Sequence, residues 1–510
     1  MYGSVASSKP AGGTATEQRG IDILDIPTDG PKNNDVASGR SQTLFGLVVL
    51  SCSLFALVFG VVLASTLKQE VIPGAAMAMA TTLALPNPTA TLSSRGQGVK
   101  AVRDDLQMYL AAASDPYHPT ENKDGYLVML VAENKQMWSE MAHKLESVQA
   151  SRQLPEWTFL YGDMGGQRDF KQSIAHMMQK WIDPPVNPDK LRFQAGAGSV
   201  LDQLSYTLAD TNDGVLVTAP NYGAFGGDFG VYGNLKLHVA PTKAENGYAP
   251  TVAELDDCFD RSLAAGNPPK ILIICQPNNP TGIIYSYDAM LLMITWALQR
   301  GLHVVSDEIY ALSVFPGHST VSAAQIMADL NAGQENYLGD RVHIVAGLSK
   351  DWGMSGFRVG SLFTHNAMLL QAMDLLGYYQ SVSQYTQQML TGVFDDHAWV
   401  DWYVAENQKR LFENYKALRE ALSLVHVPVL QSHGGLFAWA DFSSLLKDGQ
   451  TEKELWLELF DKPKVALTSG ESCNGEKPGL FRIVYAWPEG GTAAMRELGE
   501  RLVKWKSERE

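Results

Sequence analysis

Four short apolar runs in this chain each lead into side chains that can do chemistry. The runs cover residues 214–220, 270–277, 301–308 and 341–347. The chemically active residues at their ends are Asn221-Tyr222, Asn278-Asn279-Pro280, Asp307-Glu308-Ile309-Tyr310 and Ser349-Lys350. Because ligands of open α/β sheets bind beyond the carboxyl ends of the strands, we expect carboxyl groups, amides, two phenols and an amine to meet there. A single lysine after a strand is typical of a solvated surface, so it is the combination that indicates a cofactor site.

The segment around the lysine carries the most specific pattern. It reads GLSKDWGMSGFRVG over residues 347–360 and resembles the signature with which class I/II aminotransferases bind pyridoxal phosphate (PLP). LVAEN at 130–134, GLFAW at 435–439 and PGLFR at 478–482 are similar to the 1-aminocyclopropane-1-carboxylate (ACC) synthase branch of that family. The resemblance covers roughly residues 95–505.

The resemblance implies a role for each active residue. Lys350 would hold PLP as a Schiff base and, once substrate displaces it, move the α-proton as general base. Asp307 would pair with the pyridinium nitrogen and keep the ring able to accept electrons from Cα. Tyr310 and Asn279 would hydrogen-bond the phenolic oxygen of the cofactor, and Tyr222 would stack on its ring.

A phosphate group needs donors and positive charge, and the resemblance implies Ser349 and Arg358 as two of its partners. The short glycine run after the strand-like residues 191–194 would add backbone N–H groups at a helix N-terminus. That run is Gly196, Ala197, Gly198 and Ser199. A dinucleotide (NAD) site is the weaker alternative for such glycines, because Leu201 stands where the third glycine of that motif belongs.

Substrate binding is implied at two residues. Arg482 resembles the arginine that grips the substrate carboxylate at two points, and Glu133 resembles the carboxylate that ACC synthases use near their cationic substrate. Tyr161 is similar to a tyrosine that reaches a cofactor phosphate across a dimer interface, so a homodimer is implied. Its local sequence, YGDMGG, is equally typical of a core tyrosine.

The chain departs from the ACC synthase pattern at two positions. Met164 stands where those enzymes carry a tyrosine, and a thioether cannot act as a phenol. Gly347 stands where they usually place a serine that would contact the phosphate. Both departures weaken the prediction of γ-elimination from S-adenosylmethionine, and neither affects the prediction of cofactor binding.

The scaffold that positions these residues is predicted to be α/β. Apolar runs of branched residues alternate with helical patterns such as 287–300 and 405–425, which is typical of a mostly parallel sheet with helical layers. The resemblance implies PLP-dependent transferase fold type I. Its large PLP domain, with a sheet of the seven-stranded type, would span about 165–395, and a smaller α/β domain would combine 95–164 and 396–510.

The N-terminal region differs from the predicted catalytic domain at 95–510. We expect a disordered tail over 1–42, because its polar composition cannot offset the entropy lost on ordering. Residues 43–65 are apolar and uncharged, which predicts a single transmembrane helix followed by a linker at 66–94. A cleaved targeting peptide is the alternative. The few flanking cations leave open which side of the membrane carries the enzyme.

Composition excludes other classes of function. The formal net charge of −15 argues against nucleic-acid binding, which depends on clustered Lys and Arg. The four cysteines are far apart and form no CxxC pair, so neither a disulfide framework nor a metal site is predicted.

Three functions are consistent with the sequence. Transamination of an α-amino acid is the preferred hypothesis, and ACC formation or a related elimination on PLP is the second. A membrane-anchored binding protein that has lost catalysis is the third, and the joint presence of Lys350, Asp307 and Arg482 argues against it.

Overall fold

The computed structural model describes residues 92–98 and 104–509. The predicted tail at 1–42 and transmembrane helix at 43–65 lie outside these residues, as does almost all of the predicted linker. Within the two described ranges, no helix has both the length and the apolar character needed to cross a bilayer. The chain divides into the units Met1–Gln97 and Gly98–Glu510. Helix α3 (Ser94–Gly98) belongs to the first unit except for its last residue, and the elements that follow all belong to the second.

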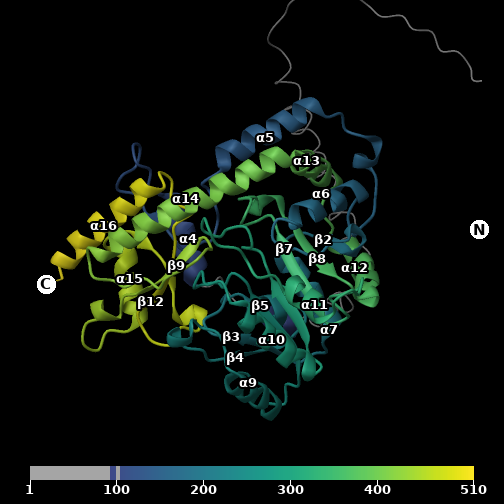
Figure 1. The fold of residues 1–510 in the computed structure, drawn as a ribbon. Helices are drawn as coiled ribbons and strands as arrows, with labels where there is room; N and C mark the ends of the chain where they lie inside the picture. Colours follow the sequence, from purple (N-terminus) through teal and green to yellow (C-terminus); the bar gives the residue numbers. More distant parts are fainter. Residues whose placement is uncertain (1–91, 99–103, 510) are drawn as a thin grey trace, which may run out of the picture. The chain divides into compact units, whose positions relative to one another are not determined.

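A seven-stranded sheet forms the centre of a large domain (Figure 1). Its strand order is β2-β8-β7-β6-β5-β3-β4. The strands are β2 (Leu191–Gln194), β3 (Gly214–Thr218), β4 (Lys236–Ala240), β5 (Pro269–Cys275), β6 (His303–Asp307), β7 (Val342–Gly347) and β8 (Gly360–Thr364). Strand β8 is antiparallel to both of its neighbours, and the other neighbouring pairs are parallel. The mostly parallel seven-stranded sheet predicted from the sequence is confirmed.

The central strands are apolar on both faces because helices cover both faces. In β5, Ile271 and Ile273 belong to one hydrophobic core, while Leu272 and Ile274 belong to another on the opposite face. The helices of this region are α5 (Trp138–Ser151), α6 (Arg168–Met178), α7 (Ala197–Leu208), α8 (Phe225–Gly230), α9 (Val252–Ala264), α10 (Tyr287–Gln299), α11 (Ala323–Leu330), α12 (Ala367–Gln380) and α13 (Gln384–Phe394). Helices α7 and α8 pack into the first core, and α6, α9 and α10 into the second.

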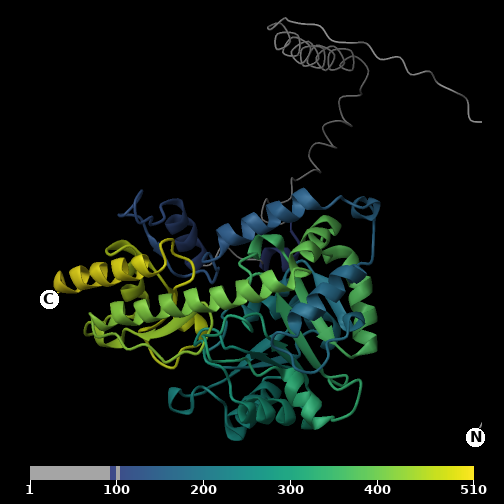
Figure 2. The same cartoon turned by 45° about the horizontal axis from the view of Figure 1, so that its top comes forward.

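A small domain packs beside the large sheet. Its antiparallel sheet has the order β11-β12-β9, and β1 pairs in parallel with β10. The strands are β1 (Leu127–Val128), β9 (Phe437–Asp441), β10 (Val465–Ala466), β11 (Thr468–Ser469) and β12 (Leu480–Val484). The helices are α4 (Asp104–Ser114), α14 (His397–Ser423), α15 (Glu452–Asp461) and α16 (Thr492–Ser507). The long helix α14 runs beside α16, as Figures 1 and 2 show from two directions.

Short 3₁₀ turns complete the described fold. They lie at Glu156–Phe159, Pro188–Lys190, Ala244–Asn246, Ser355–Phe357, Ser443–Leu445 and Glu471–Cys473.

The topology brings the predicted active residues to one edge. Strands β7, β6, β5 and β3 are consecutive neighbours and run in parallel. Their carboxyl ends therefore lie side by side, and the segments that follow them open at the same edge of the sheet. This arrangement confirms the expectation that four loops far apart in sequence meet at one place.

Candidate active site

Lys350 follows β7, and its amine contacts the segment that follows β1. Its Nζ donates a hydrogen bond to the carbonyl oxygen of Ala132 (2.7 Å). Burial lowers the pKa of Lys350 to about 8, and the nearby cations Arg482 and Arg358 act in the same direction. Glu133 and Asp307 oppose this shift. A substantial fraction of this amine is therefore neutral, and nucleophilic, near neutral to mildly alkaline pH.

Asp307 is the last residue of β6 and lies opposite Cys275 of β5. Its side chain is buried, and its Oδ1 accepts a hydrogen bond from the backbone N–H of Ile309 (3.3 Å). Burial raises the pKa of Asp307 to about 7, and the Asp228 carboxylate adds to the rise. A buried carboxyl group in this state gains stability when a positively charged partner arrives beside it.

A chain of hydrogen bonds joins the large domain to the small domain. Asn279 Nδ2 donates to the hydroxyl of Tyr310 (3.3 Å), and Arg482 Nη1 donates to Asn279 Oδ1 (3.0 Å). All three side chains are buried. Burial also raises the pKa of Tyr310 well above its usual value, so the phenol remains a hydrogen-bond donor.

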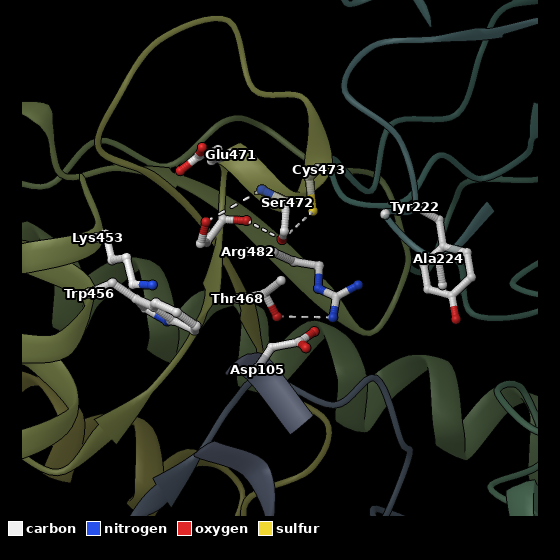
Figure 3. A pocket seen from close by; sticks show the side chains of 12 residues that line it. Asp105, Tyr222, Ala224, Lys453, Trp456, Thr468, Glu471, Ser472, Cys473 and Arg482 are labelled. Atoms are coloured by element: carbon white, nitrogen blue, oxygen red, sulfur yellow. Dashed lines mark hydrogen bonds between the residues drawn. The ribbon is translucent and has the colours of Figure 1, made fainter. Parts of the chain in front are cut away.

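Arg482, on β12, is directed into a cavity of about 520 Å³. Its Nη2 donates to the carbonyl oxygen of Leu130 (2.6 Å) and to Thr468 Oγ1 (3.1 Å), while its buried Nε has no hydrogen-bond partner. Figure 3 shows the guanidinium group beside Thr468, with Tyr222 across the cavity. An incompletely satisfied, buried guanidinium facing a cavity is suited to bind a carboxylate.

The N-terminus of α7 lies against Arg358. Gly196 precedes the helix with φ 95°, and a Cβ atom on this residue would lie 2.3 Å from Arg358 Nη2. Arg358 is itself left-handed (φ 54°), and it donates to the carbonyl oxygens of Ser355 and Ala195. The predicted run of Gly196, Ala197, Gly198 and Ser199 thus begins a helix, as expected, with a cation beside it. Helix N-termini of this kind bind phosphate groups.

Glu133 lies close enough to Lys350 to affect its pKa. Its carboxylate accepts hydrogen bonds from Ser355 Oγ (2.6 Å) and Trp487 Nε1 (3.3 Å). The Nζ of Lys135 in turn lies 3.3 Å from the centre of a Trp487 ring. The Glu133 side chain is therefore held in one orientation from two sides.

Tyr161 lies apart from this group. Its side chain is 88% exposed, and its nearest aromatic neighbour is Tyr378, with ring centres 6.4 Å apart. The alternative that Tyr161 is a core tyrosine is therefore wrong. Met164 lies three residues further on, where its backbone packs against Gly377 of α12.

A family model described as aminotransferase class I and II matches residues 135–502. The chain belongs to this family. An ACC synthase from Cucurbita maxima is 30% identical over 384 residues, covering 73% of this chain and 77% of the relative. An ACC synthase from Glycine max is 31% identical over 385 residues, covering 73% and 79%.

Solved structures show the same fold. An aspartate aminotransferase from Thermus thermophilus matches with a TM-score of 0.67 and 17% identity, covering 81% of this chain and 99% of that one. An aromatic aminotransferase from Pyrococcus horikoshii matches with a TM-score of 0.64 and 20% identity, covering 75% and 96%. The aminotransferase fold, with its large sheet and small domain, is thus shared across these proteins.

Family membership implies PLP, and the residues of this aminotransferase-family chain fit that cofactor. Lys350 offers an amine of lowered pKa, and Asp307 a buried carboxyl group suited to a pyridinium nitrogen. A side chain at Gly196 would fill the space beside Arg358 at the helix N-terminus. Ser349 is buried next to Lys350. The residues thus supply an amine, a carboxyl group and an anion-binding helix N-terminus at one edge of the sheet.

Three residues that hold side chains of this site in place were not predicted from the sequence. Thr468 holds Arg482, while Ser355 and Trp487 hold Glu133. Ser355 lies within the signature segment and could have been singled out there. Thr468 and Trp487 carry no signal, because a threonine in a two-residue strand and a tryptophan after β12 are ordinary core residues.

Proposed function

We propose that this chain is a PLP-dependent aminotransferase that carries the cofactor on Lys350. The observation that supports this most is the placement of Lys350: its half-buried amine follows β7, donates to the carbonyl oxygen of Ala132 and lies near Asp307, Glu133 and Arg482, and burial lowers its pKa to about 8. Structural lysines normally remain charged on the surface. A lysine tuned in this way at the carboxyl edge of a parallel sheet is suited to imine and proton-transfer chemistry.

The residues of this chain would divide the work. PLP, when bound, withdraws electrons from the substrate Cα. Asp307 would hold the proton on the cofactor nitrogen, and Tyr310 with Asn279 would bind the phenolic oxygen. Arg482 would fix the substrate carboxylate and so set the angle of the Cα–H bond. Lys350, as a free amine, would take the α-proton.

The phosphate would lie at the N-terminus of α7. Arg358, Ser349 and the N–H groups of the run 196–199 would bind it, and Tyr222 would cover the ring. Tyr161 would act in a homodimer, where its exposed phenol could reach the phosphate site of the partner subunit.

Transamination is the proposed outcome, because Met164 replaces the phenol that ACC synthases carry. Elimination from S-adenosylmethionine is the second candidate. It is supported by the ACC synthase relatives and by the carboxylate of Glu133 near Lys350. However, both oxygens of Glu133 already accept hydrogen bonds within the chain. A binding protein without catalysis is a third, less supported, function.

The experiment is to incubate the protein with PLP and a panel of amino acids and to identify products by mass spectrometry. Keto acids are expected, and ACC with methylthioadenosine from S-adenosylmethionine at a comparable rate would favour the second candidate. Borohydride reduction and peptide mapping should place the pyridoxyl group on Lys350, and Lys350→Ala should remove both the label and turnover. A label on a different lysine would refute the assignment.

A further inference from the structure

The carboxylate of Glu452 is buried at the start of α15 although it contacts neither Lys350 nor Arg482. It is 6% exposed and lies one residue after the N-cap, Thr451. The N-terminus of a helix stabilises a negative charge, so the position is electrostatically favourable. Because an isolated buried carboxylate is costly, its partners indicate why it is there.

Glu452 holds both ends of one ten-residue connection. Its Oε1 accepts hydrogen bonds from Ser469 Oγ (2.9 Å) and from the backbone N–H of Glu471 (2.9 Å), just where β11 ends. Its Oε2 accepts the backbone N–H of Gly479 (2.8 Å), just before β12 begins. The single side chain thus closes the neck of the connection between β11 and β12.

Both strands at this neck hold Arg482 in place. Thr468 of β11 lies opposite Arg482 of β12, and its Oγ1 accepts from the guanidinium group. The connection also carries Ser472 and Cys473 to the wall of the cavity (Figure 3). One turn along α15, Trp456 Nε1 donates to the carbonyl oxygen of Leu467 (2.7 Å), which supports β11 a second time.

We infer that Glu452 is a positioning residue for the substrate-carboxylate site, acting through Thr468 and the β11–β12 neck on Arg482. This inference rests on the proposed function in assigning the carboxylate to Arg482. The carboxylate is needed because three donors converge on it. An amide has only one acceptor oxygen, so in Glu452→Gln the NH₂ group would face a backbone N–H donor in place of an acceptor. The hydrogen bonds to one of the two strand ends would then be lost, and that end would move away from α15.

The test compares Glu452→Gln with Glu454→Gln in the full chain. Glu454 lies on the same helix, and its exposed side chain accepts hydrogen bonds from the N-cap residue Thr451. Both changes weaken the start of α15, and only the first reaches β11 and β12. Ser469→Ala, which removes one of the three donors, supplies a milder variant in case Glu452→Gln does not fold.

For Glu452→Gln we expect KM for the accepted amino acid to rise roughly tenfold to a hundredfold and kcat to fall as well, because a misplaced Arg482 weakens carboxylate binding and no longer fixes the angle of the Cα–H bond. Ser469→Ala should give a smaller rise in KM, and Glu454→Gln none. The absorbance of the bound cofactor should be unchanged in all three. An unaltered KM, or equal effects of Glu452→Gln and Glu454→Gln, would overturn the inference.

Failure of the proposed function would look different. If the wild-type protein turns over no amino acid, calorimetric binding of amino acids and simple carboxylates to the PLP-loaded protein replaces KM. Weaker binding in Glu452→Gln than in Glu454→Gln would then still support the positioning role. Equal binding by the two variants, or no carboxylate binding by the wild-type protein, would refute it.

Discussion

At the scale of single residues, the site consists of groups whose charge is unfavourable without a partner. Asp307 and Lys350 both have pKa values shifted toward neutrality by burial. In the folded chain each is less stable in its charged form than it would be in water. Such groups reduce the stability of the cofactor-free protein and become favourable once a ligand of opposite charge or a covalent partner is present.

Asp307→Asn should therefore stabilise the cofactor-free protein while weakening its function. The pKa of Asp307 rises from 3.8 to about 7 on folding, so wild-type stability falls as pH increases through this interval and the loss is complete above pH 7. The shift corresponds to at most about 4 kcal/mol. Thermal unfolding should show a higher Tm for the variant at pH 8 and little difference near pH 4. Turnover with PLP should fall by several orders of magnitude. Near-normal turnover would show that Asp307 does not serve the cofactor nitrogen.

Glu133→Gln should make Lys350 more acidic. The Glu133 charge raises the pKa of Lys350 against the larger effect of burial, so its removal should move that pKa below 8. The rate at which added PLP bonds to the cofactor-free protein, followed by absorbance, should reach half its maximum at lower pH in the variant. Glu121→Gln, which removes an exposed carboxylate, is the control. A profile that is unchanged or moved to higher pH would contradict the prediction.

At the scale of elements, a close contact joins the loop after β3 to the turn before β12. The backbone N–H of Asn221 donates to the carbonyl oxygen of Cys473 (2.9 Å). A Cβ atom on Gly223 would lie 2.1 Å from the backbone oxygen of Ser472. Only glycine allows the two backbones to approach this closely. Cys473 is buried beside this contact.

Gly223→Ala should separate the two segments and expose the thiol of Cys473. We expect a maleimide to label Cys473 at least about tenfold faster in the variant, since each 1.4 kcal/mol lost from the contact is tenfold in the open population. Peptide mapping distinguishes Cys473 from the other buried thiols. Gly227→Ala is the matched control, because a Cβ atom there meets nothing within 4 Å. Equal labelling rates in the two variants would mean that the contact does not protect the thiol.

At the scale of the whole molecule, the apolar residues 43–65 distinguish this chain from a domain made of the aminotransferase fold alone. This segment lies outside the described residues, so its predicted membrane insertion depends on length and composition. A helix inserted across a bilayer is not removed by alkaline carbonate, unlike a peripheral contact.

The full chain should therefore sediment with membranes and resist carbonate extraction. A truncated chain that begins at Arg95 should remain in the supernatant and retain turnover, because the site residues all follow that point. The measurement is fractionation followed by activity in each fraction. A mature protein whose first residue lies beyond Ser65 would instead indicate a cleaved targeting segment.

The sequence by itself predicted the strands that the structure confirms, and it singled out the lysine of the proposed site. Buried parallel strands are short, continuous apolar runs, so β3, β5, β6 and β7 could be predicted from the order of apolar residues along the chain. The residues around Lys350 form one contiguous motif, which allowed the family resemblance to assign Asp307, Asn279, Tyr310 and Arg482 as well. Such patterns involve residues that are close together in the sequence, so they can be recognised without the structure.

Only the tertiary structure decided how those residues are held. Trp487 reaches Glu133 across 354 positions of sequence, and Leu130 accepts from Arg482 across 352. These contacts join the segment after β1 to β12 and the residues that follow it, two parts of the small domain that are far apart in sequence. Hydrogen bonds form within about 3 Å in space, whatever the separation along the chain. No periodicity or composition records that distance, so Thr468, Trp487 and Glu452 emerged only from the fold.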